Sequence, residues 1–264
     1  MRRQWFGLLP VLAIAAFAAT AAVAADLPVA PRPAPAYYPP PPAHYNWSGF
    51  YFGGNVGVGL VRDVVTAGAT TVFADGGVLP IGTKTNVSPY ALIGGPEVGM
   101  NLQFGPAVVG VEGTWTSSYI TGNYTAPLGG TGGQEQSRSA PHWYWTATGK
   151  LGFAANDLLF YAKGGAAGMR VDYTQSELNA AGGLVSQQTL ATNRNGWTAG
   201  AGIEYALNEN LSAKLEYDFL SFGTRNYIFP NVAPGGLPIS VQSQTHMILL
   251  GMNYRFYFGG FGQY

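Results

Sequence analysis

The chain has 264 residues with 38 glycines, and 10% of its residues are charged while 14% are aromatic. A soluble domain with so little charge would cover its surface poorly, and a disordered chain would lack the aromatic residues. The formal net charge is zero and cysteine is absent, so no broad attraction to nucleic acid is implied, and disulfides, thiolate catalysis and a lipoprotein anchor are excluded. A surface partly covered by lipid fits this composition.

The first 24 residues have the composition of a secretory signal peptide. Arg2 and Arg3 precede an apolar stretch over residues 8–19, and small residues at 22–24 allow cleavage before Ala25. A membrane-anchoring helix is the alternative, but these small residues favour cleavage. No other run reaches the roughly 20 apolar residues that a spanning helix needs. Export is therefore predicted, with any membrane span made by strands.

Residues 25–46 are rich in proline, including the run 39–42. Proline lacks the backbone donor of a ladder strand, so this segment is predicted to be a polyproline II spacer. It is either a plain periplasmic linker or a segment that contacts the cell wall or another periplasmic partner.

Residues 47–256 contain eight segments in which apolar and polar residues alternate, as they do along half-exposed strands. Very short turns near Gly105, Asn156 and Asn208 join three pairs of them, and long connections separate the pairs. An even number of strands, each long enough to cross a bilayer, predicts an all-β fold, an eight-stranded antiparallel up-and-down transmembrane β-barrel. The expected strands are residues 47–60, 90–104, 107–119, 143–153, 158–172, 196–206, 211–220 and 245–256.

The long connections are expected to be external loops, because short turns face the periplasm in outer-membrane barrels. Loops of this length are usually functional or mobile. They are residues 61–89, 117–142, 173–195 and 221–243.

In each segment the apolar residues share one parity and are assigned to the lipid face, among them Leu102, Val109, Leu151, Leu215 and Leu250. The other parity places acids and bases inside the barrel. An eight-stranded barrel is just wide enough for side chains to fill, so enclosed charges must be paired or wet. The inward set is Glu97, Glu112, Lys150, Lys163, Glu204, Lys214, Glu216, Asp218 and Arg255.

We interpret this set as a salt-bridge network that fills the lumen. The alternatives are a hydrated lumen with unpaired charges, or Glu97 and Glu112 as paired catalytic carboxylates. Arg255 is the expected partner of both carboxylates, because its planar fork can serve two at once.

Outward aromatic residues are expected to form two girdles at the ends of the strands, where amphipathic rings settle at the headgroup level. The outer girdle is Trp143, Trp145, Trp197 and Phe219. The periplasmic girdle is Phe104, Phe153, Phe160, Tyr205 and Phe256.

Motifs for catalysis or cofactor binding are weak. The three histidines are far apart, no H-E-x-x-H or G-x-S-x-G is present, and the glycines near Gly164 lack the following helix of a phosphate-binding turn. No metal, cofactor or enzymatic activity is expected. A lipid-modifying enzyme would need a rim-facing nucleophile and a histidine, for which only Thr245 and His246 are candidates.

Residues 46–57, Asn-Trp-Ser-Gly-Phe-Tyr-Phe-Gly-Gly-Asn-Val-Gly, resemble the start of the small outer-membrane β-barrels called outer-membrane immunogenic or porin-family proteins in alphaproteobacteria. Residues 250–256 resemble the last strand of that family. The resemblance implies a barrel in the outer membrane, exposed to a host or the soil, without a known substrate. It also implies that Tyr254 and Phe256 carry the signal for the barrel-assembly machinery. Because residues 257–264 follow as an extension, Tyr264 is an alternative for this role.

Two functions remain open from the sequence. One is a barrel with a polar, largely plugged lumen that acts in envelope structure and surface interaction through four long loops. The other is a narrow porin for small solutes. The expected partners are outer-membrane lipid and lipopolysaccharide, the barrel-assembly machinery, and peptidoglycan or a host surface, with no nucleic acid.

Overall fold

The computed structural model describes residues 45–130 and 132–256. The predicted signal peptide, the proline-rich segment as far as residue 44 and the extension 257–264 lie outside the described residues. Among the described residues there is no helix that is long and apolar enough to cross a membrane.

Twelve β-strands are described, and their bounds follow the alternation of apolar and polar residues. They are β1 Gly49–Ala67, β2 Thr71–Val72, β3 Val78–Leu79, β4 Lys84–Val87, β5 Tyr90–Phe104, β6 Ala107–Ser118, β7 Gly122–Pro127, β8 Gln134–Ala155, β9 Leu158–Leu178, β10 Leu184–Ala206, β11 Leu211–Phe229 and β12 Leu237–Phe256.

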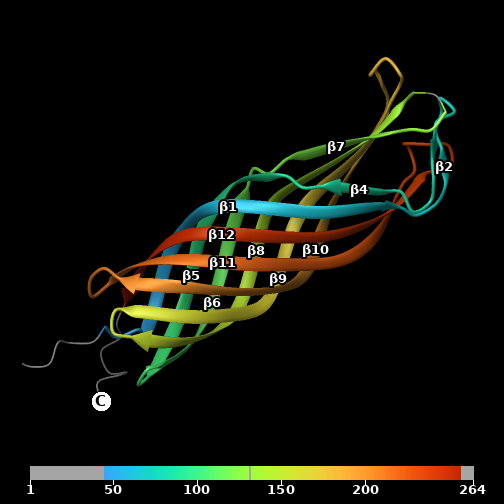
Figure 1. The fold of residues 1–264 in the computed structure, drawn as a ribbon. Helices are drawn as coiled ribbons and strands as arrows, with labels where there is room; N and C mark the ends of the chain where they lie inside the picture. Colours follow the sequence, from blue (N-terminus) through green and yellow to red (C-terminus); the bar gives the residue numbers. More distant parts are fainter. Residues whose placement is uncertain (1–44, 131, 257–264) are drawn as a thin grey trace, which may run out of the picture. The chain divides into compact units, whose positions relative to one another are not determined.

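Eight strands form a closed antiparallel ring (Figure 1). The order is β1, β5, β6, β8, β9, β10, β11 and β12, and β12 pairs with β1 to close it. Beyond the ends of β5 and β6, β4 pairs with β1 and β7 pairs with β8. The prediction of an eight-stranded up-and-down barrel is confirmed.

The register of the ring requires tilted strands. Successive ladder partners can be followed around the ring from Arg62 of β1, starting with Gln244 of β12. This path returns to β1 at Phe52 instead of Arg62. Such a stagger implies an inclination of about 35–45° to the barrel axis. Residues at one depth are therefore displaced by roughly one position from strand to strand along this path.

The prediction of four long loops is wrong for the segments 173–195 and 221–243, because ring strands continue far into them, whereas residues 68–89 and 119–133 are long connections between ring strands. β8, β9 and β10 have 22, 21 and 23 residues. At about 3.3 Å per residue, 20 residues span about 65 Å, twice the ~30 Å hydrocarbon core. The segment 173–195 is strand except for a tip at residues 179–183, and 221–243 is strand except for residues 230–236.

The outward surface changes character partway along the barrel. In β12 the outward side chains from Ile248 to Phe256 are apolar, whereas Gln242 and Gln244 occupy the same face further out. In β10 the apolar outward series ends at Trp197, and Asn195 follows. An outward apolar band therefore occupies the half of the barrel that carries the short turns, as in membrane-spanning barrels.

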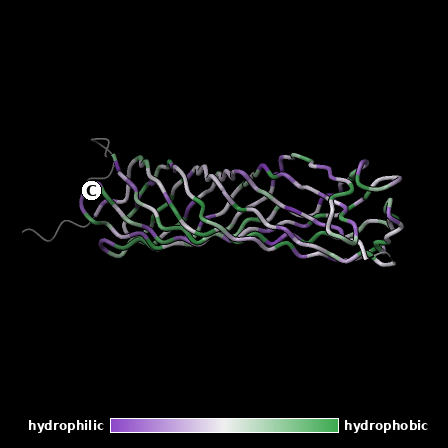
Figure 2. Tube along the Cα trace, turned by 90° about the horizontal axis from the view of Figure 1, so that it is seen from above, coloured by the Kyte–Doolittle hydropathy of each residue, from purple (hydrophilic) through white to green (hydrophobic). Residues whose placement is uncertain are grey.

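Hydrophilic and hydrophobic residues alternate along the trace (Figure 2), and the inward surface changes in the opposite sense to the outward one. Beyond the apolar band, inward positions such as Ile239, Val241 and Val171 are apolar and belong to one large buried cluster. We call this part the outer extension. Its outer face is mainly polar and its core is mainly apolar, as in a water-soluble β-barrel, so the strand pattern used for the membrane part is largely reversed there.

Candidate functional site

The interior of the membrane part holds one connected group of charged side chains, centred on Glu112 of β6. Its carboxylate lies 2.8 Å from the Nζ atom of Lys150, 3.0 Å from that of Lys163 and 3.5 Å from that of Lys214. The three lysines come from β8, β9 and β11. Glu112 therefore joins strands on several sides of the ring.

The lysines extend the group to three more carboxylates. Lys163 lies 2.6 Å from Glu216 and 3.1 Å from Asp218. Lys214 lies 2.8 Å from Glu97 and 3.2 Å from Glu216. The exposed fraction of each of these side chains is zero except for Asp218, at 4%. We call these seven residues the lysine network: Glu97, Glu112, Lys150, Lys163, Lys214, Glu216 and Asp218.

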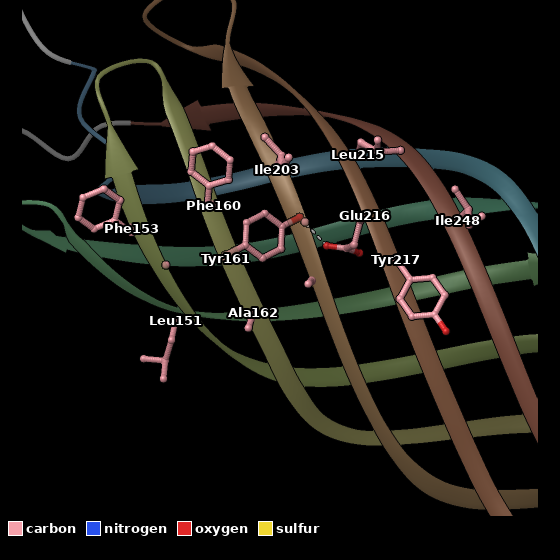
Figure 3. A pocket seen from close by; sticks show the side chains of 13 residues that line it. Leu151, Phe153, Phe160, Tyr161, Ala162, Ile203, Leu215, Glu216, Tyr217 and Ile248 are labelled. Carbon is pink, nitrogen blue, oxygen red and sulfur yellow. Dashed lines mark hydrogen bonds between the residues drawn. The ribbon is translucent and has the colours of Figure 1, made fainter.

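Two tyrosines complete the polar contacts of this network. The hydroxyl of Tyr51 donates a 2.8 Å hydrogen bond to Glu112, and that of Tyr161 donates a 2.6 Å bond to Glu216 (Figure 3). A Cβ atom on Gly202 would lie only 2.5 Å from the Tyr161 hydroxyl oxygen. Glycine at this strand position thus leaves space for the ring.

Arg255 belongs to a different contact, and its predicted pairing with Glu97 and Glu112 is wrong. One guanidinium nitrogen donates a 2.6 Å hydrogen bond to the carbonyl oxygen of Trp47, and the other lies 3.5 Å from Glu204. Lys214 and the other lysines occupy the positions around the two carboxylates instead. Sequence parity indicates which residues face inward but not their depth in a tilted barrel.

The chain before β1 covers the end of the barrel that carries the short turns. Trp47 is fully buried, and Tyr45 packs against it at a ring-centroid distance of 4.6 Å. Both pack with Val108, Leu159 and other side chains at that end. The Arg255 guanidinium lies over both rings, at 5.5 Å and 4.9 Å. The packed unit therefore includes Tyr45, inside the segment expected to be linker.

On the other side of the lysine network, hydroxyl groups precede the apolar core of the outer extension. Thr114 and Thr146 share a 2.7 Å hydrogen bond, and Thr245 donates to the Tyr144 hydroxyl at 3.4 Å. The interior is therefore filled in successive layers: aromatic rings, charges, hydroxyl groups and apolar side chains.

Four buried charged groups of the outer extension were missed by the sequence reasoning. Arg194 donates to the Tyr173 hydroxyl and to three backbone carbonyl oxygens, including that of Val241. Asp63 accepts a 2.5 Å hydrogen bond from Ser139, and burial raises the pKa of its carboxyl. These positions fall in segments expected to be loops, so no inward parity was assigned to them.

Glu135 and Glu177 face each other across the β8–β9 ladder in the outer extension, and both are buried. Burial raises the pKa of Glu135 to about 7, although Ser137 donates a 2.7 Å hydrogen bond to it. Among the described residues, no group of three or more histidine, aspartate and glutamate side chains could hold a metal ion.

The residues considered for a lipid-modifying site do not converge. Thr245 is buried inside the barrel, whereas the neighbouring His246 is on the outward face and contacts the Tyr217 hydroxyl at 2.8 Å through Nδ1. A second outward histidine, His142, lies 2.9 Å from Asp172. A nucleophile and its base would have to face the same side.

The aromatic residues expected at the outer ends of the strands lie near the middle of them instead. Trp143 is within β8 and stacks on Trp115 of β6 at 4.6 Å, and Trp197 contacts Phe219 at 5.4 Å. They mark the outer border of the apolar band, beyond which the strands continue. The C-terminal pair Tyr254 and Phe256 is outward-facing, with ring centroids 5.0 Å apart.

An apolar groove of about 810 Å³ lies on the outer wall over β8 to β12 (Figure 3). Its lining includes small residues, Ala162, Ala201 and Gly202, beside large ones such as Phe160 and Leu215. Glu216 also lines the groove, but its carboxylate lies 2.6 Å from Lys163 inside the barrel. The groove belongs to the outward apolar surface and not to the lysine network.

A closed antiparallel ring with an outward apolar band and inward charges defines a membrane-spanning β-barrel. A family model described as outer membrane protein beta-barrel domain matches residues 9–256. A 31 kDa outer-membrane immunogenic protein of Brucella melitensis biotype 1 is 31% identical over 248 residues, 92% of this chain and 97% of that protein. A 25 kDa outer-membrane immunogenic protein of Brucella abortus biovar 1 is 28% identical, over 86% of this chain and 85% of that protein.

The chain therefore belongs to this outer-membrane β-barrel family, and its location is the outer membrane. The resemblance predicted from the opening and closing strands is confirmed. Among solved structures, the outer membrane protein OprG of Pseudomonas aeruginosa is 12% identical, with a TM-score of 0.43 over 80% of this chain and 99% of that one. In outer-membrane β-barrels the short turns face the periplasm. The end of this barrel that carries the short turns and Trp47 is therefore the periplasmic end.

Proposed function

We propose that this protein is a structural and surface-interaction barrel whose lumen is filled. It anchors an outer extension at the cell surface and closes its periplasmic end with Trp47 and Arg255. Tyr45 lies at the periplasmic mouth, and peptidoglycan is a candidate partner on that side. No catalytic role is proposed for the carboxylates of the lysine network, because each of them pairs with a lysine.

The observation that carries this proposal is the contact of Glu112 with three lysines from three other strands. These side chains have no exposed area, so water and ions reach none of them from either end. A buried charge that loses its partner is strongly destabilising, which keeps such a network closed. The apolar cluster of the outer extension supports the same conclusion, because its side chains fill much of the interior beyond the hydroxyl layer.

Solute flux into liposomes tests the proposal. Refolded protein in liposomes should admit a small neutral sugar no faster than empty liposomes do. A variant with Glu112→Ala, Lys163→Ala and Trp47→Ala should admit the sugar faster, because it removes side chains from two layers of the filling. The triple change Asn195→Ala, Gln187→Ala and Thr189→Ala on the outward face of β10 is the matched control.

Rapid sugar entry through the wild-type protein, equal to that through the Glu112, Lys163 and Trp47 variant, would support the narrow porin instead. Unboiled gel mobility should first establish that each protein is folded as a barrel. A variant that fails to fold is replaced by Trp47→Ala alone, which removes the periplasmic closure and leaves the lysine network intact.

A further inference from the structure

Exposed charges on the outer wall are separated by sign, although the formal net charge of the chain is zero. Among the described residues, the exposed acids are Asp157 and Glu209, both in periplasmic turns, and Asp172 on the cell-surface side is half-buried. All the exposed bases lie beyond the apolar band, on the cell-surface side. They are Arg62, Lys84, Arg138, Arg170 and Arg225.

Two of these bases stand at the border of the apolar band. Arg62 is the first outward position after Leu60 in β1. Arg170 follows the outward positions Ala166 and Gly168 in β9. Arg225 does not belong to this outward series, because the register shift after Ser221 pairs it with the inward Val241. We call Arg62 and Arg170 the arginine collar.

The aromatic residues at this border indicate that it lies at the depth of the lipid headgroups. Trp143 is the ladder partner of Arg170, and it stacks on Trp115 at 4.6 Å. Tryptophan rings settle at the headgroup level of a bilayer. A guanidinium group beside them is therefore held at the height of lipid phosphates, and its fork matches phosphate oxygens with paired hydrogen bonds.

The collar has no counter-charge within the described part of the protein. Neither of its two guanidinium groups takes part in an ion pair there. The nearest acid along β9, Asp172, is engaged by His142 at 2.9 Å. By contrast, the buried Arg194 and Arg255 each make hydrogen bonds to protein atoms. An external anion thus has access to the collar without displacing an internal partner.

We propose that the arginine collar binds the phosphate groups of the phosphorylated glycolipid that forms the outer leaflet. The two arginines lie on β1 and β9, on opposite sides of the ring, so they face a layer that surrounds the wall rather than one pocket. Lipid headgroups form such a layer, whereas a soluble anion would favour a single cluster. This inference does not depend on whether the lumen is filled.

The test uses the full mature chain in detergent micelles, titrated with purified lipopolysaccharide and followed by tryptophan fluorescence. The double variant Arg62→Gln/Arg170→Gln should bind at least about tenfold more weakly than wild type, because both charge-assisted hydrogen bonds to lipid phosphate are lost. The matched control Lys84→Gln/Arg138→Gln removes the same charge further from the border. It should bind within about twofold of wild type.

Two further arms identify the ligand. Lipopolysaccharide treated with phosphatase should bind wild type and both variants equally and weakly. Inorganic phosphate should not compete at equal concentration. Equal losses in the two double variants, unchanged binding after phosphatase treatment, or competition by inorganic phosphate would each overturn the proposal. Should a double variant fail to fold, as judged by unboiled gel mobility, the single changes Arg62→Gln and Arg170→Gln give the same comparison.

Discussion

Arg255 and Trp47 are 208 positions apart in the chain, yet the guanidinium of one donates a 2.6 Å hydrogen bond to the carbonyl oxygen of the other. The contact joins the end of β12 to the segment before β1, so it ties the closing strand of the ring to its first residues. Glu204 of β10 lies on the other side of the same guanidinium. One side chain thus secures both the periplasmic closure and a buried carboxylate.

Replacing Arg255 by methionine should lower the free energy of unfolding by about 3–5 kcal/mol, because Glu204 is then left buried without its counter-charge. Urea titration of the refolded barrel measures this. The exposed Arg225→Met is the matched control and should change stability by no more than about 0.5 kcal/mol. Equal effects of the two substitutions would contradict the role given to Arg255.

The three lysines of the network should differ in importance. Lys163 contacts the carboxylates of Glu112, Glu216 and Asp218, whereas Lys150 pairs with Glu112 alone. Lys163→Met should therefore destabilise the barrel more than Lys150→Met, since it leaves more buried carboxylates unmatched. Urea unfolding of both variants, with the exposed Lys84→Met as control, checks the order. The reverse order would show that charge matching does not govern this interior.

The cost of placing an arginine on the outward surface should show where the apolar band ends. Leu215→Arg, in the band, should cost about 2–4 kcal/mol near the bilayer midplane. Gln242→Arg and Thr189→Arg, on outward positions of the outer extension, should cost little, because they remain in water. Unfolding measured in lipid vesicles compares the three. A similar cost at all three positions would mean that the band extends further than its side chains indicate.

The outer extension should lose stability as pH rises through the range between the unfolded and folded pKa of Glu135. Burial raises its folded pKa to about 7 from the ordinary value of 4.5, so the folded state holds the proton more tightly. The contribution of Glu135 to the free energy of unfolding is therefore complete below about pH 4.5, declines up to about pH 7 and is lost above it. The change amounts to about 3 kcal/mol at most.

Glu135→Gln should remove this dependence. Hydrogen exchange of the β8 and β9 backbone near residues 135 and 177, corrected for intrinsic rates, should be slower in the variant than in wild type at pH 8. At pH 4 the two proteins should exchange alike. The exposed Glu209→Gln, at the opposite end, is the control. Slower exchange in wild type at pH 8 would show that Glu135 is stabilised as a carboxylate, contrary to this account.

The sequence predicted the strands of the membrane part well, because lipid on one side and a polar lumen on the other impose a strict alternation. The β5 strand, Tyr90–Phe104, has the predicted bounds. The alternation reverses in the outer extension, where water replaces lipid, and segments such as 173–195 were therefore taken for loops. Inward charges were identified by parity, but their partners depend on strand tilt, which parity does not contain. This is why Arg255 was assigned to the wrong carboxylates.

Single-channel recording in planar bilayers tests the filled lumen most directly. The account predicts that wild-type protein shows no steady openings, and that Trp47→Ala combined with Lys163→Ala produces them by removing side chains from two layers of the interior. Steady, large openings of the wild-type protein, with the same amplitude in the double variant, would contradict the account.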